Sequence, residues 1–98
     1  MKMTKNLNGT ALQIALEGRL DTTTAPELEK ELKASLGAAT ELTLDFANLE
    51  YISSAGLRVL LSAHKAMAGK GGMKVINVND IVNEVFEVTG FADILTIE

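Results

Sequence analysis

Apolar and polar residues alternate along the start of the chain, which is the pattern of a β-strand with one buried face. The alternating positions are Met3, Lys5 and Leu7 in one segment, and Leu12, Ile14 and Leu16 in the next. Between them, Asn8-Gly9 is a dipeptide that tolerates the positive φ angles of a tight turn. The pattern therefore predicts an antiparallel hairpin.

The spacing then changes to one apolar residue in every four, which is typical of a helix. The stripe consists of Leu28, Leu32 and Leu36. Thr24 lies three residues before Glu27, as in a capping box, and Pro26 falls in the first turn, where its missing N–H costs nothing. We expect the helix to begin there and to stop at Gly37.

A second strand–helix unit follows. Leu42, Leu44 and Phe46 alternate as a third strand, which must run parallel to the second because a helical crossover separates them. Helical spacing then links Leu57, Leu60, Leu61, His64 and Met67. The glycine-rich segment 69–72 ends this helix, and residues 73–78 predict a fourth strand.

The last third of the chain predicts one more helix and a short strand. Asn79 or Asp80 can cap the helix, and Gly90 can close it. Its expected apolar side consists of Ile81, Val82, Val85 and Phe86, and residues 94–97 form the strand. The predicted fold class is α/β: a mixed sheet of about five strands, the first antiparallel, with about three helices packed against it.

Length and composition limit the alternatives. The chain has 98 residues, which is enough for one domain spanning residues 1–98. It has no Cys and one His, which excludes thiolate zinc sites, disulfides and iron–sulfur clusters, so we expect no metal or cofactor. No apolar run reaches membrane-spanning length, and the first residues lack the apolar stretch of a secretory signal, so we expect a cytoplasmic protein.

The net charge of −4 is unevenly distributed along the sequence. Residues 54–74 carry four bases and no acid, whereas residues 75–98 carry five acids and no base. Four spaced cations fall short of the basic surface that a nucleic-acid-binding protein needs to displace counterions. We therefore expect no direct binding to DNA or RNA.

Ser53-Ser54-Ala55-Gly56 joins the third strand to the second helix. A serine at this position can cap the first helical turn, which stabilises a helix by about 1 kcal/mol. A helix N-terminus also tolerates negative charge, so a phosphate on Ser54 need not unfold the helix. Such a phosphate would change the surface charge while the fold stays intact.

These segments resemble the STAS domain family of sulfate transporters and anti-sigma factor antagonists, and in particular its small stand-alone bacterial members. The signature segment is Ile52-Ser53-Ser54-Ala55-Gly56-Leu57, with Asp45 and Leu49 upstream. A second matching segment is Gly18-Arg19-Leu20-Asp21 before the first helix. The resemblance covers nearly the whole chain in order.

The resemblance implies an anti-sigma factor antagonist rather than an enzyme. In the family, the serine at the position of Ser54 is phosphorylated by an anti-sigma factor serine kinase. The unphosphorylated protein binds this kinase and frees the sigma factor, phosphorylation releases it, and a serine phosphatase resets it. Phosphoryl transfer needs a nucleotide cradle and metal-binding acids, so this chain would supply only the acceptor and a docking surface.

The resemblance also implies a docking surface around Ser54. Its candidate residues are Asp21, Thr22, Thr23, Ser53, Ala55, Gly56 and Arg58, with Arg19 beside them. Ser53 stands where the family usually has Asp, which makes it the second candidate acceptor. The chain also ends where many relatives continue into a C-terminal helix, so we expect some apolar surface to be exposed and the protein to be a monomer or a weak dimer.

Two catalytic interpretations fail on spacing. A serine hydrolase needs a base beside its nucleophile, but the single His, His64, lies ten residues beyond Ser54, roughly 15 Å along a helix. Gly69-Lys70-Gly71-Gly72 lacks the earlier Gly and the following Ser or Thr of a phosphate-binding loop. We expect His64 to be a packing residue and the glycine-rich segment to be a helix stop.

Two alternatives remain open. Asp21 and Asp45 are both expected near strand ends close to the second helix, where they could hold Mg²⁺ or, as we favour, bond loop N–H groups. The chain could also be a constitutive STAS adaptor subunit of a transporter or a stress-signalling complex that is never phosphorylated.

Overall fold

The computed structural model describes all residues, 1–98. Five strands form one sheet in the order β1-β2-β3-β4-β5, in which β1 is antiparallel to β2 and all other pairs are parallel. The strands are β1 (Lys2–Asn8), β2 (Ala11–Leu20), β3 (Glu41–Ile52), β4 (Met73–Ile76) and β5 (Thr96–Ile97). The helices are α1 (Ala25–Ser35), α2 (Ser54–Met67) and α3 (Asp80–Thr89), with short 3₁₀ turns η1 (Leu36–Ala38) and η2 (Phe91–Asp93). The predicted fold class is confirmed.

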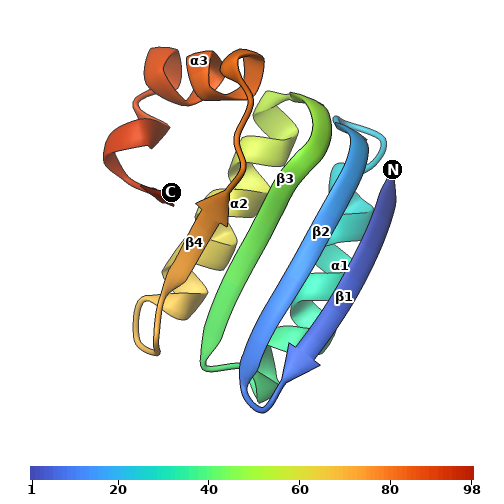
Figure 1. The fold of residues 1–98 in the computed structure, drawn as a ribbon, viewed down its shortest axis with the longest axis vertical. Coiled ribbons are helices and arrows are strands. Elements are labelled where there is room, and N and C mark those ends of the chain that lie inside the picture. Colours follow the sequence, from blue (N-terminus) through green and yellow to red (C-terminus); the bar gives the residue numbers. More distant parts are fainter.

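The helices α1 and α2 cover one face of the sheet, and the other face carries no helix (Figure 1). The period of two in β2 explains this arrangement, because its buried Leu12, Ile14 and Leu16 alternate with residues on the open face. One cluster of 23 buried hydrophobic residues fills the space between sheet and helices. No helix of the structure combines the length and the apolar character needed to cross a membrane.

Helix α3 lies at one end of the sheet rather than over its face (Figure 1). Phe86 packs against Phe46 of β3, with ring centroids 6.4 Å apart. Asn79 caps the helix by accepting a hydrogen bond from the Val82 N–H, and Gly90 ends it with a φ of 82°, both as predicted. Ile81, expected on the buried side, is 61% exposed, because α3 covers only an end of the core.

The end of α1 differs from the prediction. Gly37 does not provide a left-handed stop; the helix tightens into η1, which contains this glycine. The exposed carbonyl groups there are bonded by Lys70, whose Nζ donates to Leu36 O at 2.7 Å and to Ala39 O at 3.2 Å. Through Lys70, the glycine-rich segment 69–72 that follows α2 therefore contacts the end of α1.

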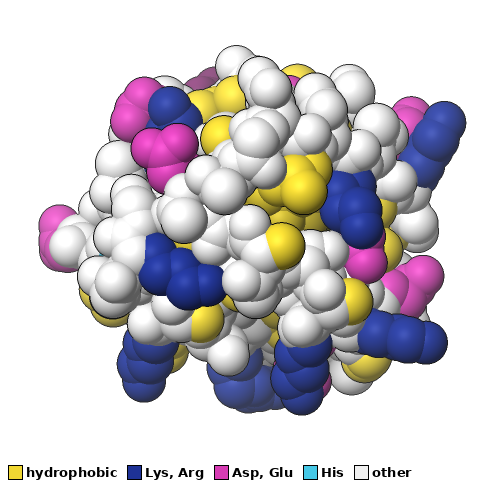
Figure 2. All heavy atoms as spheres, turned by 90° about the horizontal axis from the view of Figure 1, so that it is seen from below, with side chains coloured by type: hydrophobic (Ala, Val, Ile, Leu, Met, Phe, Trp, Pro, Cys, Tyr) yellow, Lys and Arg dark blue, Asp and Glu magenta, His cyan; other side chains and the backbone are white.

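Lys and Arg side chains project separately around the underside of the molecule, and apolar atoms show between them (Figure 2). Of the four cations in residues 54–74, Lys70 donates hydrogen bonds to carbonyl groups at the end of α1. The Nζ of Lys74 lies 3.9 Å from Oε1 of Glu98. The Lys and Arg side chains do not form one continuous patch in this view.

Candidate functional site

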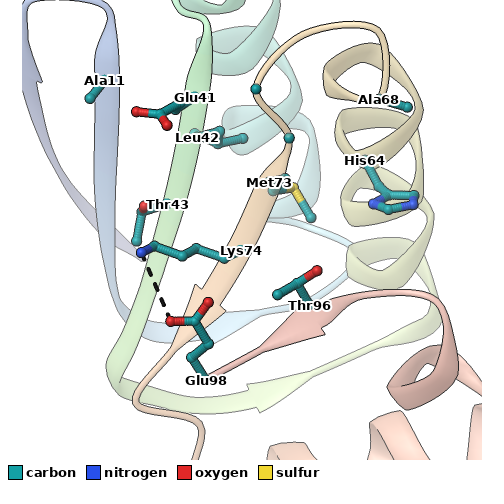
Figure 3. A pocket seen from close by; sticks show the side chains of 12 residues that line it. Ala11, Glu41, Leu42, Thr43, His64, Ala68, Met73, Lys74, Thr96 and Glu98 are labelled. Carbon is teal, nitrogen blue, oxygen red and sulfur yellow. Dashed lines mark ion pairs between the residues drawn. The ribbon is translucent and has the colours of Figure 1, made fainter.

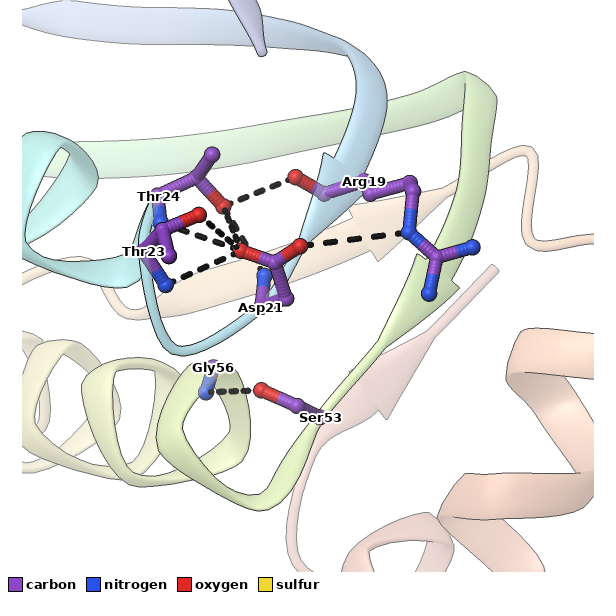
Figure 4. A network of polar contacts seen from close by, with 6 residues as sticks. All are labelled: Arg19, Asp21, Thr23, Thr24, Ser53 and Gly56. Atoms are coloured by element: carbon purple, nitrogen blue, oxygen red, sulfur yellow. Dashed lines mark hydrogen bonds and ion pairs between the residues drawn. The ribbon is translucent and has the colours of Figure 1, made fainter.

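The carboxyl ends of β2 and β3 meet at one edge of the sheet. Leu20 pairs with Ile52, and the Ser53 N–H donates to Leu20 O at 2.9 Å. The turn that follows β2 and the first turn of α2 therefore emerge side by side (Figure 4). The two signature segments of the sequence meet at this edge.

The two adjacent serines have different positions at the start of α2. Ser53 is the N-cap, with extended backbone, and its Oγ accepts a hydrogen bond from the Gly56 N–H at 3.3 Å. Ser54 is the first helical residue; its side chain is exposed and its hydroxyl bonds to no other group of the protein. The Ser54 hydroxyl is thus free, whereas the half-buried Ser53 hydroxyl is used by the helix.

Gly56 is buried and allows this close approach of helix and sheet. A Cβ atom at this position would lie 2.8 Å from Leu20 Cγ and 2.9 Å from Ile52 Cγ1. Both are closer than real Cβ contacts, so the first turn of α2 packs here only because residue 56 has no side chain. Of the predicted docking residues, Gly56 lies beneath the surface, whereas Thr22, Thr23 and Arg58 are exposed.

Asp21 organises the turn between β2 and α1. Its Oδ1 accepts hydrogen bonds from the Thr23 N–H at 3.0 Å, the Thr24 N–H at 3.1 Å and the Thr23 hydroxyl at 2.8 Å. The favoured structural role of Asp21, bonding of loop N–H groups, is confirmed. The predicted capping box of Thr24 is wrong, because the Thr24 hydroxyl donates to Arg19 O and accepts from the Asp21 N–H instead, both at 2.8 Å.

These bonds favour the charged form of Asp21. The Thr23 hydroxyl has the largest effect and, with the two backbone N–H groups, lowers the pKa of the Asp21 carboxyl, although partial desolvation opposes this. Arg19 lies beside the carboxylate, with Nε 3.8 Å from Oδ2, and its guanidinium lies 4.5 Å from the centroid of the Tyr51 ring. The Asp21 turn is a fixed, negatively charged neighbour of the α2 N-terminus.

Asp45 does not lie near the start of α2, contrary to our expectation. β3 continues to Ile52, which pairs with Leu20. Asp45 pairs with Ala15, which lies five residues before Leu20 on β2. At about 3.3 Å per residue this places the two carboxylates at different levels of the sheet. The Asp45 Oδ1 accepts from the Ala47 N–H at 2.9 Å and from the Asn77 side chain at 3.0 Å. The Asp21–Asp45 pair required for a Mg²⁺ site does not form.

His64 lies on a different part of α2, at a cavity of about 460 Å³ near the start of β4 (Figure 3). The side chain is half-buried, as predicted, and its Nδ1 has no hydrogen-bond partner. The cavity also contacts Met73 and the Lys74–Glu98 pair. Neither Ser53 nor Ser54 lines it.

Comparison with known proteins identifies the family. The sequence model described as Mlab, STAS domain, matches residues 3–96. BtrV of Bordetella bronchiseptica, assigned as an anti-sigma factor antagonist, is 35% identical over 99% of this chain and 85% of its own length. The anti-sigma-B factor antagonist of Bacillus subtilis is 28% identical over 92% of this chain and 84% of its own length.

Solved structures share the fold. An anti-sigma factor antagonist from Mycobacterium paratuberculosis has a TM-score of 0.89 at 20% identity, over 98% of this chain and 83% of its own. The antagonist SpoIIAA in its unphosphorylated form has a TM-score of 0.85 at 18% identity, covering 99% of this chain and 88% of its own. The Bacillus protein SpoIIAA in its phosphorylated form gives 0.76 at 18% identity, covering 99% and 91%.

Substitution Gly56→Ala should destabilise the protein. Its Cβ would overlap Leu20 and Ile52, and we expect the free energy of unfolding to fall by about 1 to 2 kcal/mol even though Ala is the better helix former. Gly37→Ala is the control, because no atom lies within 4 Å of its Cβ position; it should leave stability unchanged or slightly higher. Urea denaturation measures both, and equal stability of the two variants would contradict the close packing at Gly56.

The lowered pKa of Asp21 predicts a pH dependence of stability. Because the folded-state pKa is below the unfolded-state pKa, the contribution is complete above the unfolded value and is lost as pH falls through the folded value. The Tm difference between wild type and Asp21→Asn should therefore shrink as pH falls from about 7 to about 3. Thr23→Val removes the main donor and should raise the pKa of Asp21 in an NMR titration. A Tm difference that stays constant with pH would contradict the assignment.

Proposed function

Because the chain belongs to the STAS domain family, we propose that it is an anti-sigma factor antagonist that binds an anti-sigma factor and so frees a sigma factor. The names of its relatives support this class of function. The observation that carries the proposal is the Ser54 hydroxyl, exposed and unbonded at the start of α2. The chain then acts as a cytoplasmic regulatory binding protein and not as an enzyme.

Ser54 is the proposed phosphoacceptor. Its partner is an anti-sigma factor serine kinase, which transfers the γ-phosphoryl group of ATP to the Ser54 oxygen, with loss of the hydroxyl proton and release of ADP. Ser53 is the poorer candidate because its side chain is half-buried and its oxygen already accepts from the Gly56 N–H, whereas Ser54 is exposed. A phosphate on Ser54 is tolerated by the fold, since a helix N-terminus favours negative charge.

The proposed docking surface surrounds this hydroxyl. Thr22 and Thr23 come from the Asp21 turn, and Ala55 and Arg58 come from the first turns of α2. Gly56 contributes only by holding the helix start in place. A phosphate adds about −1.5 to −2 charges at the centre of this surface, which repels an acidic or apolar partner and releases it. A serine phosphatase would restore the binding form.

The acceptor assignment can be tested with two alanine variants. Incubation with the cognate kinase and ATP should phosphorylate wild type and Ser53→Ala but not Ser54→Ala, as measured by mass spectrometry of the intact proteins. Ser53→Ala loses the helix cap and should be less stable by about 1 kcal/mol, yet still folded. Phosphate on Ser54→Ala and none on Ser53→Ala would move the acceptor to Ser53. Partner binding without phosphate on either serine would favour the adaptor subunit.

The switch can be tested without the kinase reaction. Ser54→Asp should weaken partner binding at least tenfold because it places an anion within the docking surface, while its Tm stays within a few degrees of wild type. Ser62→Asp is the matched control: Ser62 is also exposed on α2 but lies about 12 Å further along the helix axis. Equal binding by Ser54→Asp and wild type would contradict the repulsion argument.

A further inference from the structure

Arg58 lies one helical turn beyond Ser54, on the same face of α2. We infer that Arg58 is the intramolecular counter-ion of a phosphate on Ser54, so that modification both adds negative charge and withdraws a free cation from the docking surface. This inference rests on the proposed phosphorylation of Ser54. It gives Arg58 a role in the modified state in addition to contact with a partner.

The relative position of the two residues supports an ion pair. Both side chains are exposed, and they are four positions apart in the regular helix Ser54–Met67. Residues with this spacing have Cβ atoms about 5–6 Å apart. An acidic group that precedes a basic group by four positions is the more favourable orientation for a helical ion pair. A long Arg side chain spans the remaining distance to phosphate oxygens.

Arg58 is also available. Its guanidinium takes part in none of the four ion pairs of the structure and in none of the side-chain hydrogen bonds. No acidic residue occurs between positions 54 and 74, so α2 itself offers Arg58 no competing partner. The neighbouring cation, Arg19, lies over Tyr51 and beside Asp21. The free cation of this helix start is therefore Arg58.

Guanidinium and phosphate are well matched. The planar fork of Arg donates two parallel N–H bonds to phosphate oxygens, which a Lys ammonium cannot do. A nearby positive charge also lowers the second pKa of the phosphate, so that the group carries closer to two negative charges at neutral pH. The pair of side chains thus changes from roughly +1 before modification to about −1 after it.

This change defines the partner surface that the unmodified protein fits. A partner that contacts both residues meets an uncharged hydroxyl beside a free guanidinium, so a carboxylate of the partner opposite Arg58 would be favourable. Phosphorylation pairs that guanidinium with the phosphate, so the same partner carboxylate would meet an anion instead of a free cation. Loss of the attraction and gain of a repulsion act in the same direction, and both favour release.

A double-mutant cycle tests the pairing and requires no kinase. The four proteins are wild type, Ser54→Glu, Arg58→Gln and the double variant, and the measurement is Tm at low salt and at about 1 M NaCl. We expect Arg58→Gln to lower Tm by about 1 to 4 °C more in the Ser54→Glu background than in wild type. This excess should vanish at high salt, because exposed charges are then screened. The same cycle with Lys65→Gln, which is not one turn from Ser54, should show no excess.

Phosphorus NMR of the Ser54-phosphorylated protein gives a second measurement. The acid dissociation constant of the phosphate should be about two- to threefold larger in wild type than in Arg58→Gln. No coupling in the cycle, together with equal dissociation constants, would overturn the inference and leave the proposed function standing. Coupling in the cycle with no kinase-dependent phosphate on Ser54 would support the pairing and overturn the proposed function.

Discussion

The candidate site depends on close packing between the first turn of α2 and the ends of β2 and β3. Gly56 allows the helix backbone to contact Leu20 and Ile52, and the Ser53 N–H completes the contact by bonding to Leu20 O. Because this turn cannot move outward without opening the core, Ser54 is held at a fixed place on the surface. The free hydroxyl is therefore presented by a rigid element, not by a mobile loop.

In the proposed switch, the two adjacent serines have separate roles, one in stability and one in signalling. Ser53 satisfies an N–H group that the helix would otherwise leave unpaired, whereas the Ser54 side chain is exposed and its hydroxyl bonds to no other group of the protein. The Ser53 oxygen is half-buried and bonded to the Gly56 N–H, so the two roles fall on different residues in this proposal. In the adjacent turn, Asp21 has a similar structural function, because its carboxylate bonds the backbone and holds the neighbouring surface in place.

Most of the fold could be predicted because its signals are local. The hairpin turn was predicted one position too early, since its two central residues are Gly9 and Thr10 rather than Asn8 and Gly9, with a φ of 66° at Gly9. This turn and the Asn79 and Gly90 caps need only a few neighbouring residues. The errors concern features that depend on distant contacts. The sequence pattern predicted β3 to be shorter than it is, because its buried residues after Phe46 are three positions apart instead of two. This change of spacing coincides with an irregularity in the pairing with β2. Asp45 was therefore expected at the end of the strand, whereas it lies within it.

In the site too, features set by local sequence could be predicted and features set by distant contacts could not. Ser54 and the Asp21 turn could be found from short motifs, but the steric role of Gly56 could not, because Leu20 is far from it in sequence and close only in the folded chain. The Thr24 hydroxyl was assigned to a capping box, yet it bonds the Arg19 carbonyl, which only the path of the β2–α1 turn brings within reach. Short motifs thus locate the proposed acceptor, Ser54, whereas tertiary contacts decide which neighbouring side chains are already bonded and which are unpaired.

In the proposed switch, the place of Ser54 at the helix start allows a small change of charge to act as the signal. On the core-facing side of α2, an added charge would disturb the packing of buried residues, and its effect on binding could not be separated from an effect on folding. At the first helical residue the backbone dipole favours the added charge, and the exposed Arg58 one turn later offers it a partner. In this proposal the fold is the same in both states, and a partner distinguishes them by surface charge.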